Sequence, residues 1–281
     1  MRLFLLFGVG FSLFLLGSCK KYQPADPAFF MRANKISITP TDKQGSGSHK
    51  ITDLWLYVNG QFQGCYPVGN LMPIVSKNEK VTIDILPGIK NNGISDTRIF
   101  YPMYTKLEFD TTVASGTTLE RAFTFQYKTS TIFPLIEGFE GGANGFNFVA
   151  ANSDTIFHVA SPEDSYEGNC IEMGLSGRSL VGKIESSIAY ALPHGTSDVY
   201  LELNYKCSAE IQVGVIGDDL RDNTALLIGP KSEWNKIYVQ LATVLNSPPL
   251  SNKYKIFFKL LNKDVAEPRM FLDNIKLVYL P

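Results

Sequence analysis

The segment VYLELNYKC, from Val199 to Cys207, alternates apolar and polar side chains over nine residues. Period two is the pattern of a β-strand with one buried face, and an amphipathic helix does not produce it. Further strands with this alternation are expected at 211–215, 237–241 and 256–260, and a last one at 269–280. We therefore predict that the C-terminal half of the chain is all-β.

The N-terminal half carries a second set of strand signals. Asn59-Gly60 separates the strand-like run 50–58 from 61–66, and this dipeptide tolerates the two positive φ angles of a type I′ hairpin turn. Further strands are expected at 81–85, which ends in a turn at Pro87-Gly88, and at 98–104, 106–113 and 119–127. Short strands at this spacing predict an Ig-like β-sandwich over 34–128. The polar segment Lys128–Thr131 then predicts a boundary before a second domain at 134–281.

Composition excludes several classes of protein. The chain has 281 residues, a hydrophobic fraction of 44% and a formal net charge of −1, which fits a globular protein and gives no reason to expect a nucleic-acid partner. His49, His158 and His194 are far apart, and neither Gly-x-Ser-x-Gly nor His-Glu-x-x-His occurs. We expect a noncatalytic protein.

The N-terminus has the features of an export signal. Arg2 precedes an apolar run, Leu3–Leu16, which is too short to span a bilayer but long enough for a secretory signal. Leu16-Gly-Ser-Cys19 resembles a bacterial lipobox, which implies a signal peptide at 1–18 and an N-terminal lipid on Cys19 that anchors the chain to the bilayer. Residues 19–33 are then predicted to form a tether. The other reading is an ordinary signal peptide with an incidental cysteine.

Lys20 and Lys21 follow Cys19, so neither an inner-membrane retention Asp nor the acidic export cluster of Bacteroidota lipoproteins is present. We expect a Bacteroidota-type outer-membrane lipoprotein, on the periplasmic face in preference to the cell surface.

Short motifs in 135–281 resemble those of jelly-roll carbohydrate-binding modules. They are Phe139-Glu140, Ser165-x-x-Gly168, Trp234 before a late strand, and Phe271-Leu-Asp-Asn-Ile275. The resemblance implies a jelly-roll β-sandwich that binds a glycan. Since such modules also bind proteins, a structural or accessory role in an outer-membrane protein assembly is the alternative.

Two candidate sites follow. The resemblance implies a structural calcium held by Glu140 and Asp273, whereas the residues alone leave open an ordinary hydrogen-bonded Asp273 on the same strand face as Phe271 and Ile275. Tyr200, Asn204 and Tyr238 have outward parity and are the candidate glycan-binding residues, although ordinary surface side chains would show the same pattern.

Three cysteines remain after Cys19. They are Cys65, Cys170 and Cys207, and the sequence leaves open whether Cys170 and Cys207 form a disulfide or are buried thiols.

Overall fold

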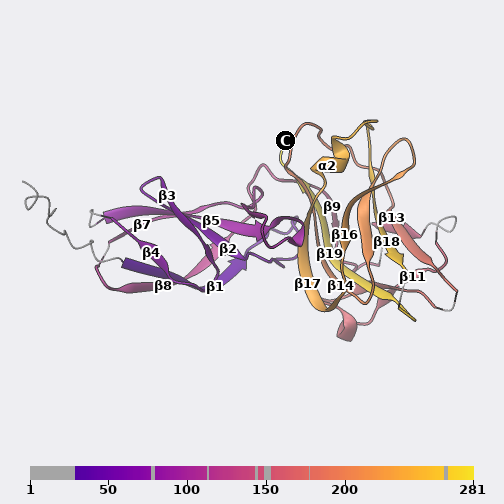
Figure 1. The fold of residues 1–281 in the computed structure, drawn as a ribbon, viewed down its shortest axis with the longest axis horizontal. Helices are drawn as coiled ribbons and strands as arrows, with labels where there is room; N and C mark the ends of the chain where they lie inside the picture. Colours follow the sequence, from indigo (N-terminus) through magenta and orange to yellow (C-terminus); the bar gives the residue numbers. More distant parts are fainter. Residues whose placement is uncertain are drawn as a thin grey trace, which may run out of the picture.

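The computed structural model describes residues 29–76, 80–112, 114–142, 145–148, 153–176, 178–262 and 265–281. The predicted signal peptide and Cys19 lie outside these ranges. Two β-domains follow one another along the long axis of the molecule (Figure 1). Within the described ranges, none of the helical segments has the length and apolar character needed to cross a membrane.

The N-terminal domain is a β-sandwich of two sheets, as predicted. One sheet has the order β4-β1-β8, and β1 pairs parallel to β8. The other has the order β3-β2-β5-β6, with β7 also paired to β5. The strand bounds are β1 Phe29–Ile38, β2 Asp53–Val58, β3 Gln61–Pro67, β4 Met72–Ile74, β5 Lys80–Lys90, β6 Arg98–Phe100, β7 Leu107–Thr112 and β8 Thr118–Phe125.

Strand β1 begins inside the segment that we predicted as tether. Phe29, Met31 and Ala33 are buried on one parity in the core between the two sheets. This burial of alternate apolar side chains holds the segment in the sheet. Residues 29–33 of the predicted tether therefore belong to the sheet, and that part of the prediction is wrong.

The predicted hairpin at Asn59-Gly60 is confirmed, whereas the prediction of a turn at Pro87-Gly88 is wrong. Asn59 and Gly60 have φ angles of 50° and 76° and join β2 to β3. Strand β5, by contrast, continues through Pro87-Gly88 to Lys90, because β2 pairs with it on one side and β6 on the other. Gly88 also gives room to the Trp55 side chain, since an added Cβ would lie 2.9 Å from the indole Nε1.

The C-terminal domain packs two sheets face to face. One sheet has the order β10-β13-β18-β15-β16, and the other has the order β11-β12-β19-β14-β17, with β9 also paired to β19. The strand bounds are β9 Ile132–Glu137, β10 Phe146–Phe148, β11 Phe157–Ala160, β12 Cys170–Gly174, β13 Val181–Ser186, β14 Val199–Cys207, β15 Ile211–Ile216, β16 Asp222–Ile228, β17 Lys231–Gln240, β18 Lys255–Leu261 and β19 Arg269–Tyr279. A short helix, α2 (Ala242–Leu245), follows β17.

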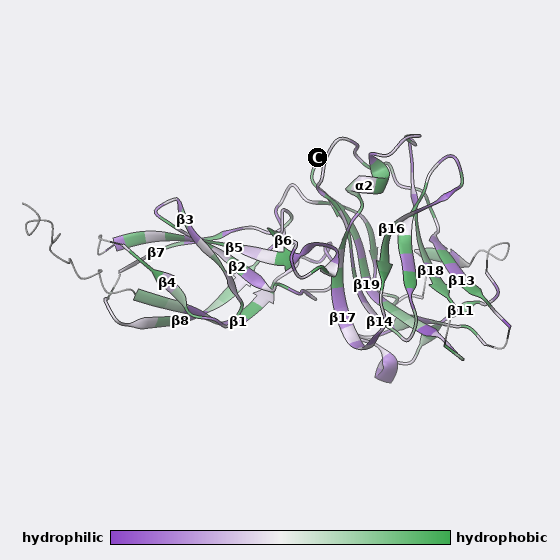
Figure 2. Cartoon of the chain, in the orientation of Figure 1, coloured by the Kyte–Doolittle hydropathy of each residue, from purple (hydrophilic) through white to green (hydrophobic). Residues whose placement is uncertain are grey.

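The predicted alternation is confirmed in the core of this domain. The β14 side chains on the predicted inward parity all lie between the sheets, namely Val199, Leu201, Leu203, Tyr205 and Cys207. The inward residues of β15, β17 and β18 pack with them. Figure 2 shows hydrophobic and hydrophilic residues interleaved along the strands of this domain. Sheet pairing changes from the N-terminal to the C-terminal domain between Phe125, at the end of β8, and Ile132, at the start of β9.

A bulge in β19 changes the predicted face of Asp273. Asn274 has a φ angle of 49°, and the pairing of β14 with β19 shifts register at this point. Inward residues therefore change parity, from Met270 and Leu272 before the bulge to Ile275 and Leu277 after it. The single apolar face that we predicted through Asp273 does not exist.

Candidate functional site at the domain junction

The predicted glycan-binding residues lie under the N-terminal domain. Tyr200, Asn204 and Tyr238 do project from the outer face of β14 and β17, but only 1%, 1% and 2% of their surfaces are exposed. Tyr200 and Tyr238 belong to the same apolar cluster as the N-terminal core. This face is an interdomain contact, so it is not the open glycan platform that we expected.

Each of these side chains has a partner in the other domain. The ring of Tyr200 lies 5.2 Å from that of Tyr101. The Tyr238 hydroxyl accepts a 3.0 Å hydrogen bond from the Lys50 backbone N–H, and Asn204 Oδ1 accepts one of 2.7 Å from the Ser48 hydroxyl. The polar groups of this face are therefore used within the chain.

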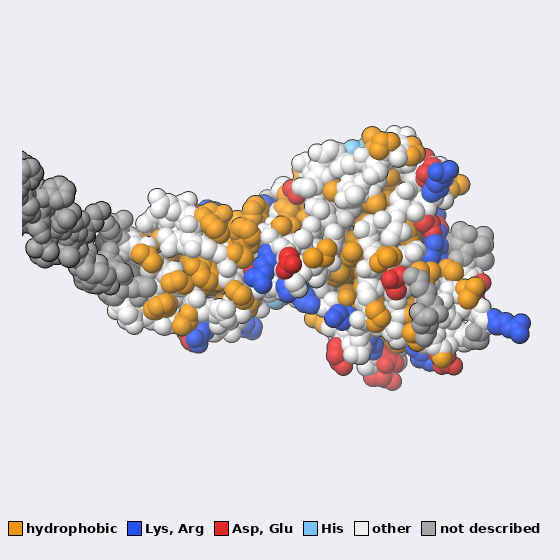
Figure 3. Space-filling model, in the orientation of Figure 1, with side chains coloured by type: hydrophobic (Ala, Val, Ile, Leu, Met, Phe, Trp, Pro, Cys, Tyr) orange, Lys and Arg blue, Asp and Glu red, His pale blue; other side chains and the backbone are white. Residues whose placement is uncertain are grey.

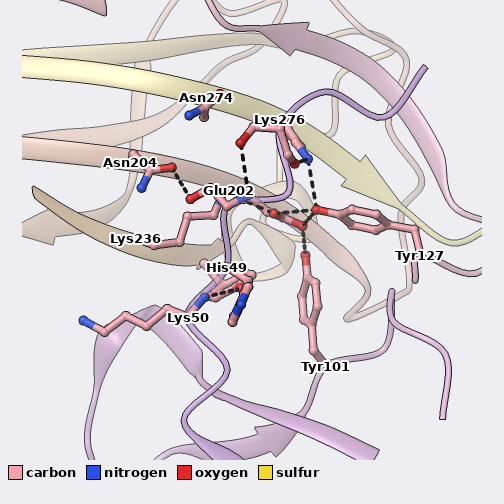
Figure 4. A network of polar contacts seen from close by, with 12 residues as sticks. His49, Lys50, Tyr101, Tyr127, Glu202, Asn204, Lys236, Asn274 and Lys276 are labelled. Carbon is pink, nitrogen blue, oxygen red and sulfur yellow. Dashed lines mark hydrogen bonds and ion pairs between the residues drawn. The ribbon is translucent and has the colours of Figure 1, made fainter. Parts of the chain in front are cut away.

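Glu202 is the centre of a buried polar network between the domains (Figure 4). Its carboxylate accepts hydrogen bonds from the Tyr101 hydroxyl at 2.8 Å and the Tyr127 hydroxyl at 2.9 Å. Lys236 Nζ lies 3.4 Å from Glu202 Oε2. A fully buried carboxylate needs such partners, and here both domains supply them.

A second buried lysine closes the network. Lys276 Nζ donates to the Ser46 carbonyl at 2.5 Å and to the Tyr127 hydroxyl at 3.3 Å. Burial lowers the pKa of Lys276 to about 8, although the Glu202 charge opposes this effect. Burial also lowers the pKa of Lys236 and raises those of Tyr101 and Tyr127.

The segment 39–52, between β1 and β2, joins the domains along this network. Its Ser46 hydroxyl donates to Glu167 Oε2 at 2.5 Å, in addition to the contacts of Ser48 and the Lys50 backbone with the C-terminal sheet. On the other side of the contact, Asn91 Nδ2 donates to Gln240 Oε1 at 3.2 Å. Hydrogen bonds from several segments thus oppose rotation of one domain against the other.

A cleft opens beside this network, between the two domains. It has a volume of about 460 Å³. The N-terminal wall comes from 50–52 and 90–95, and the C-terminal wall from Tyr205, 226–231 and 235–238. Tyr238 is the one member of our predicted glycan-binding set that lines the cleft.

The two predicted calcium ligands lie in the C-terminal domain near its junction with the N-terminal domain. Asp273 accepts hydrogen bonds from the backbone N–H groups of Glu167 at 3.0 Å and Asn274 at 2.6 Å. Glu140 accepts one from Asn169 at 3.1 Å. Burial, and then the negative charges of Glu167 and Glu140, raise the pKa of Asp273 to about 6, although the two backbone hydrogen bonds lower it.

Among the described residues, no three Asp, Glu, His or Cys side chains are grouped as a metal site.

The cysteines and Trp234 have structural surroundings. Cys65, Cys170 and Cys207 are free thiols, so Cys170 and Cys207 are not bonded here. Burial raises the pKa of Cys207 to about 11, which keeps it protonated. Trp234 lies within β17 and does not open it, and its ring packs 6.4 Å from that of Phe271.

The outer face of the N-terminal domain carries an aromatic cluster. The rings of Phe62 and Phe100 lie 5.6 Å and 6.0 Å from that of Trp55, and Tyr57 packs against Phe62. Phe62 and Phe100 are 53% and 45% exposed. In Figure 3, hydrophobic side chains are spread over the visible face of this domain.

Sequence reasoning missed the network that joins the domains. Glu202 occupies a polar position of β14, and its neighbour across the sheet on β19 is Lys276. A cross-strand pair of opposite charge is an ordinary feature of an exposed sheet face. The sequence therefore gives no sign that this pair is buried.

No family model and no curated protein matches this chain. Among solved structures, one is from work on the promiscuous specificity of carbohydrate-binding modules of the β-sandwich superfamily. It has 14% identity and a TM-score of 0.42, over 92% of this chain and 99% of its own. The CBM22-1 xylan-binding domain from Paenibacillus barcinonensis has 11% identity and a TM-score of 0.39, over 54% of this chain and 97% of its own. The K2 cleaved adhesin domain of Lys-gingipain has 12% identity and a TM-score of 0.36, over 51% and 98%.

Proposed function

We propose that this chain is a noncatalytic envelope protein, anchored by a lipid on Cys19, that holds a glycan in the cleft between its domains. The observation that carries the proposal is the cleft itself, whose two walls come from domains joined by the buried Glu202 network. A site with fixed walls loses little conformational entropy when a ligand binds.

The lining of the cleft suits a sugar. Asn92 and Ser95 supply groups that can hydrogen-bond to hydroxyls, while Leu226 and Ile237 supply an apolar wall for the face of a ring. Its volume of about 460 Å³ lies in the range of small-molecule sites.

A glycan array probed with the purified mature chain tests this function. We expect binding to a defined set of glycans, and we expect Ser95→Trp, which places an indole in the cleft, to abolish it. Thr112→Trp, on the exposed face of β7 outside the cleft, is the matched control and should bind as the wild type does. Binding that survives Ser95→Trp would show that the cleft is not the site.

The anchor would keep the protein close to the bilayer. Residues 20–28 precede β1, and nine residues span at most about 32 Å when fully extended. We propose attachment to the outer membrane, on its periplasmic face.

We further propose a structural calcium at Glu140 and Asp273. Their carboxylate oxygens are the hard donors that calcium prefers, and a cation would offset the negative charges that raise the pKa of Asp273. The metal would supply structural charge neutralisation only.

Removal of calcium should therefore lower the melting temperature. Calcium at a hundredfold excess over its dissociation constant would add about 2.7 kcal/mol to the free energy of unfolding, and EDTA would remove this gain. Asp273→Asn and Glu140→Gln should each abolish the response, whereas Glu163→Gln, in the 3-10 turn Pro162–Asp164, should keep it. Identical wild-type melting curves in EDTA and in calcium would rule the site out.

The exposed aromatic cluster favours a second function, as an accessory subunit of an outer-membrane protein assembly. Large exposed apolar patches often mark the sites at which proteins contact one another. Affinity purification from solubilised membranes should then recover a stoichiometric partner, and Phe62→Ser combined with Phe100→Ser should release it. Retention of the partner by this double variant would argue against the cluster as the contact.

A further inference from the structure

The interdomain cleft has an unbalanced charge. Among the described residues, four lysines line it, namely Lys50, Lys90, Lys231 and Lys236, and none of the lining side chains is Asp or Glu. Lys236 has the buried Glu202 as its counter-charge. Among the residues that the structure describes, no carboxylate forms an ion pair with any of the other three.

Three separate segments bring these charges together. Lys50 comes just before β2, Lys90 ends β5 and Lys231 begins β17. Burial lowers the pKa of Lys50, and the positive charges of Lys231 and Lys90 lower it further. The ammonium groups of Lys231 and Lys90 therefore each repel that of Lys50, and an anion bound in the cleft would offset this repulsion.

Neighbouring polar groups orient one of these lysines. Lys50 Nζ donates a hydrogen bond to Asn235 Oδ1, and Asn235 Nδ2 donates to the Tyr205 hydroxyl at 2.9 Å. Lys50 belongs to the N-terminal domain, and Asn235 and Tyr205 to the C-terminal domain. The position of this charge is thus set by the contact between the domains.

The rest of the lining favours an anion that is part of a larger polar molecule. Leu226, Leu227 and Ile237 form an apolar wall, and Asn92 and Ser95 offer hydrogen bonds. A bare inorganic ion would leave both unused. A sugar ring with an acidic substituent would use all three kinds of surface.

We propose that the cleft binds an acidic saccharide, and that Lys50, Lys90 and Lys231 form the counter-charge for its carboxylate or phosphate group. The proposal rests on the glycan-binding function above and adds the charge of the ligand.

The test uses the mature chain in detergent micelles and a panel of matched saccharide pairs. Each uronic-acid oligomer is paired with its methyl ester, and each phosphorylated sugar with its dephosphorylated form. We expect at least one acidic member to bind about tenfold or more tightly than its neutral partner, and its affinity to fall as salt is raised.

The matched variants assign this preference to the cleft. Lys50→Gln combined with Lys231→Gln should weaken binding of the acidic member by about tenfold or more relative to its neutral partner, so that the preference for the acidic member is lost. Lys35→Gln combined with Lys43→Gln removes two exposed charges outside the cleft and should leave this preference unchanged.

Three results would overturn the proposal. Equal binding of both members of every pair, with no effect of the lysine substitutions, would leave the glycan function standing and remove the charge preference. Binding of inorganic phosphate alone, as tight as that of the acidic saccharide, would show that the cleft does not recognise a saccharide. Binding of no saccharide at all would overturn both the proposal and the glycan function.

Discussion

Glu202→Gln is expected to lower the free energy of unfolding by about 3–5 kcal/mol, because it leaves buried lysines without their counter-charge. The substitution keeps the size of the side chain and removes its negative charge. Lys236, 3.4 Å from the carboxylate, and Lys276, bonded to the same Tyr127 hydroxyl, would both remain inside the contact. The lost stability should come from weaker contact between the two domains.

Differential scanning calorimetry measures this effect, with one variant as a control and a second as a test of rescue. Glu120→Gln removes a carboxylate from the exposed pair with Arg32 and should cost less than about 1 kcal/mol. Lys236→Met and Lys276→Met, added to Glu202→Gln, should restore much of the stability, since apolar replacement of a whole buried ionic group is often neutral. A melting temperature for Glu202→Gln equal to that of Glu120→Gln would show that the network does not stabilise the contact.

Cys19→Ala is expected to move the protein from the membrane fraction to the soluble fraction. Several acyl chains on Cys19 would anchor it durably, because each buried methylene is worth about 0.8 kcal/mol. The apolar run Leu3–Leu16 is too short to replace them by spanning the bilayer.

Fractionation of cells that express each form, followed by mass determination, measures this change. Cys65→Ala is the control, since it removes a thiol from β3 and leaves the lipobox intact. The wild type and this control should stay with the membrane and carry the added mass of the lipid. Membrane retention of Cys19→Ala at the processed size would exclude lipidation as the anchor.

The strands were predictable because their signal is local. The alternation in β14, and the Asn59-Gly60 turn between β2 and β3, each depend on residues next to one another in the chain. The turn expected at Pro87-Gly88 failed because long-range pairing with β2 and β6 outweighed the local preference. Strand β1 began earlier than expected because its first side chains are buried by distant parts of the domain.

The candidate site was much less predictable. Tyr238 was chosen as an exposed aromatic residue, and it lines the cleft from a position that is 2% exposed. The three lysines of the cleft lie at positions 50, 90 and 231, and no pattern in the sequence relates them. Asp273 shares a strand with the core residues Leu272 and Ile275, and a bulge at Asn274 changed the face on which it lies.

The sequence by itself determined which side chains of β14 face the core, because a period of two assigns every residue to one side of a sheet. It contains no information on what covers the other side. Only the tertiary structure placed Tyr101 and Tyr127 against Glu202, which turned a polar sheet face into a buried contact and left a cleft beside it. Contacts between domains depend on surfaces built from distant segments, and a pattern of neighbouring residues does not encode them.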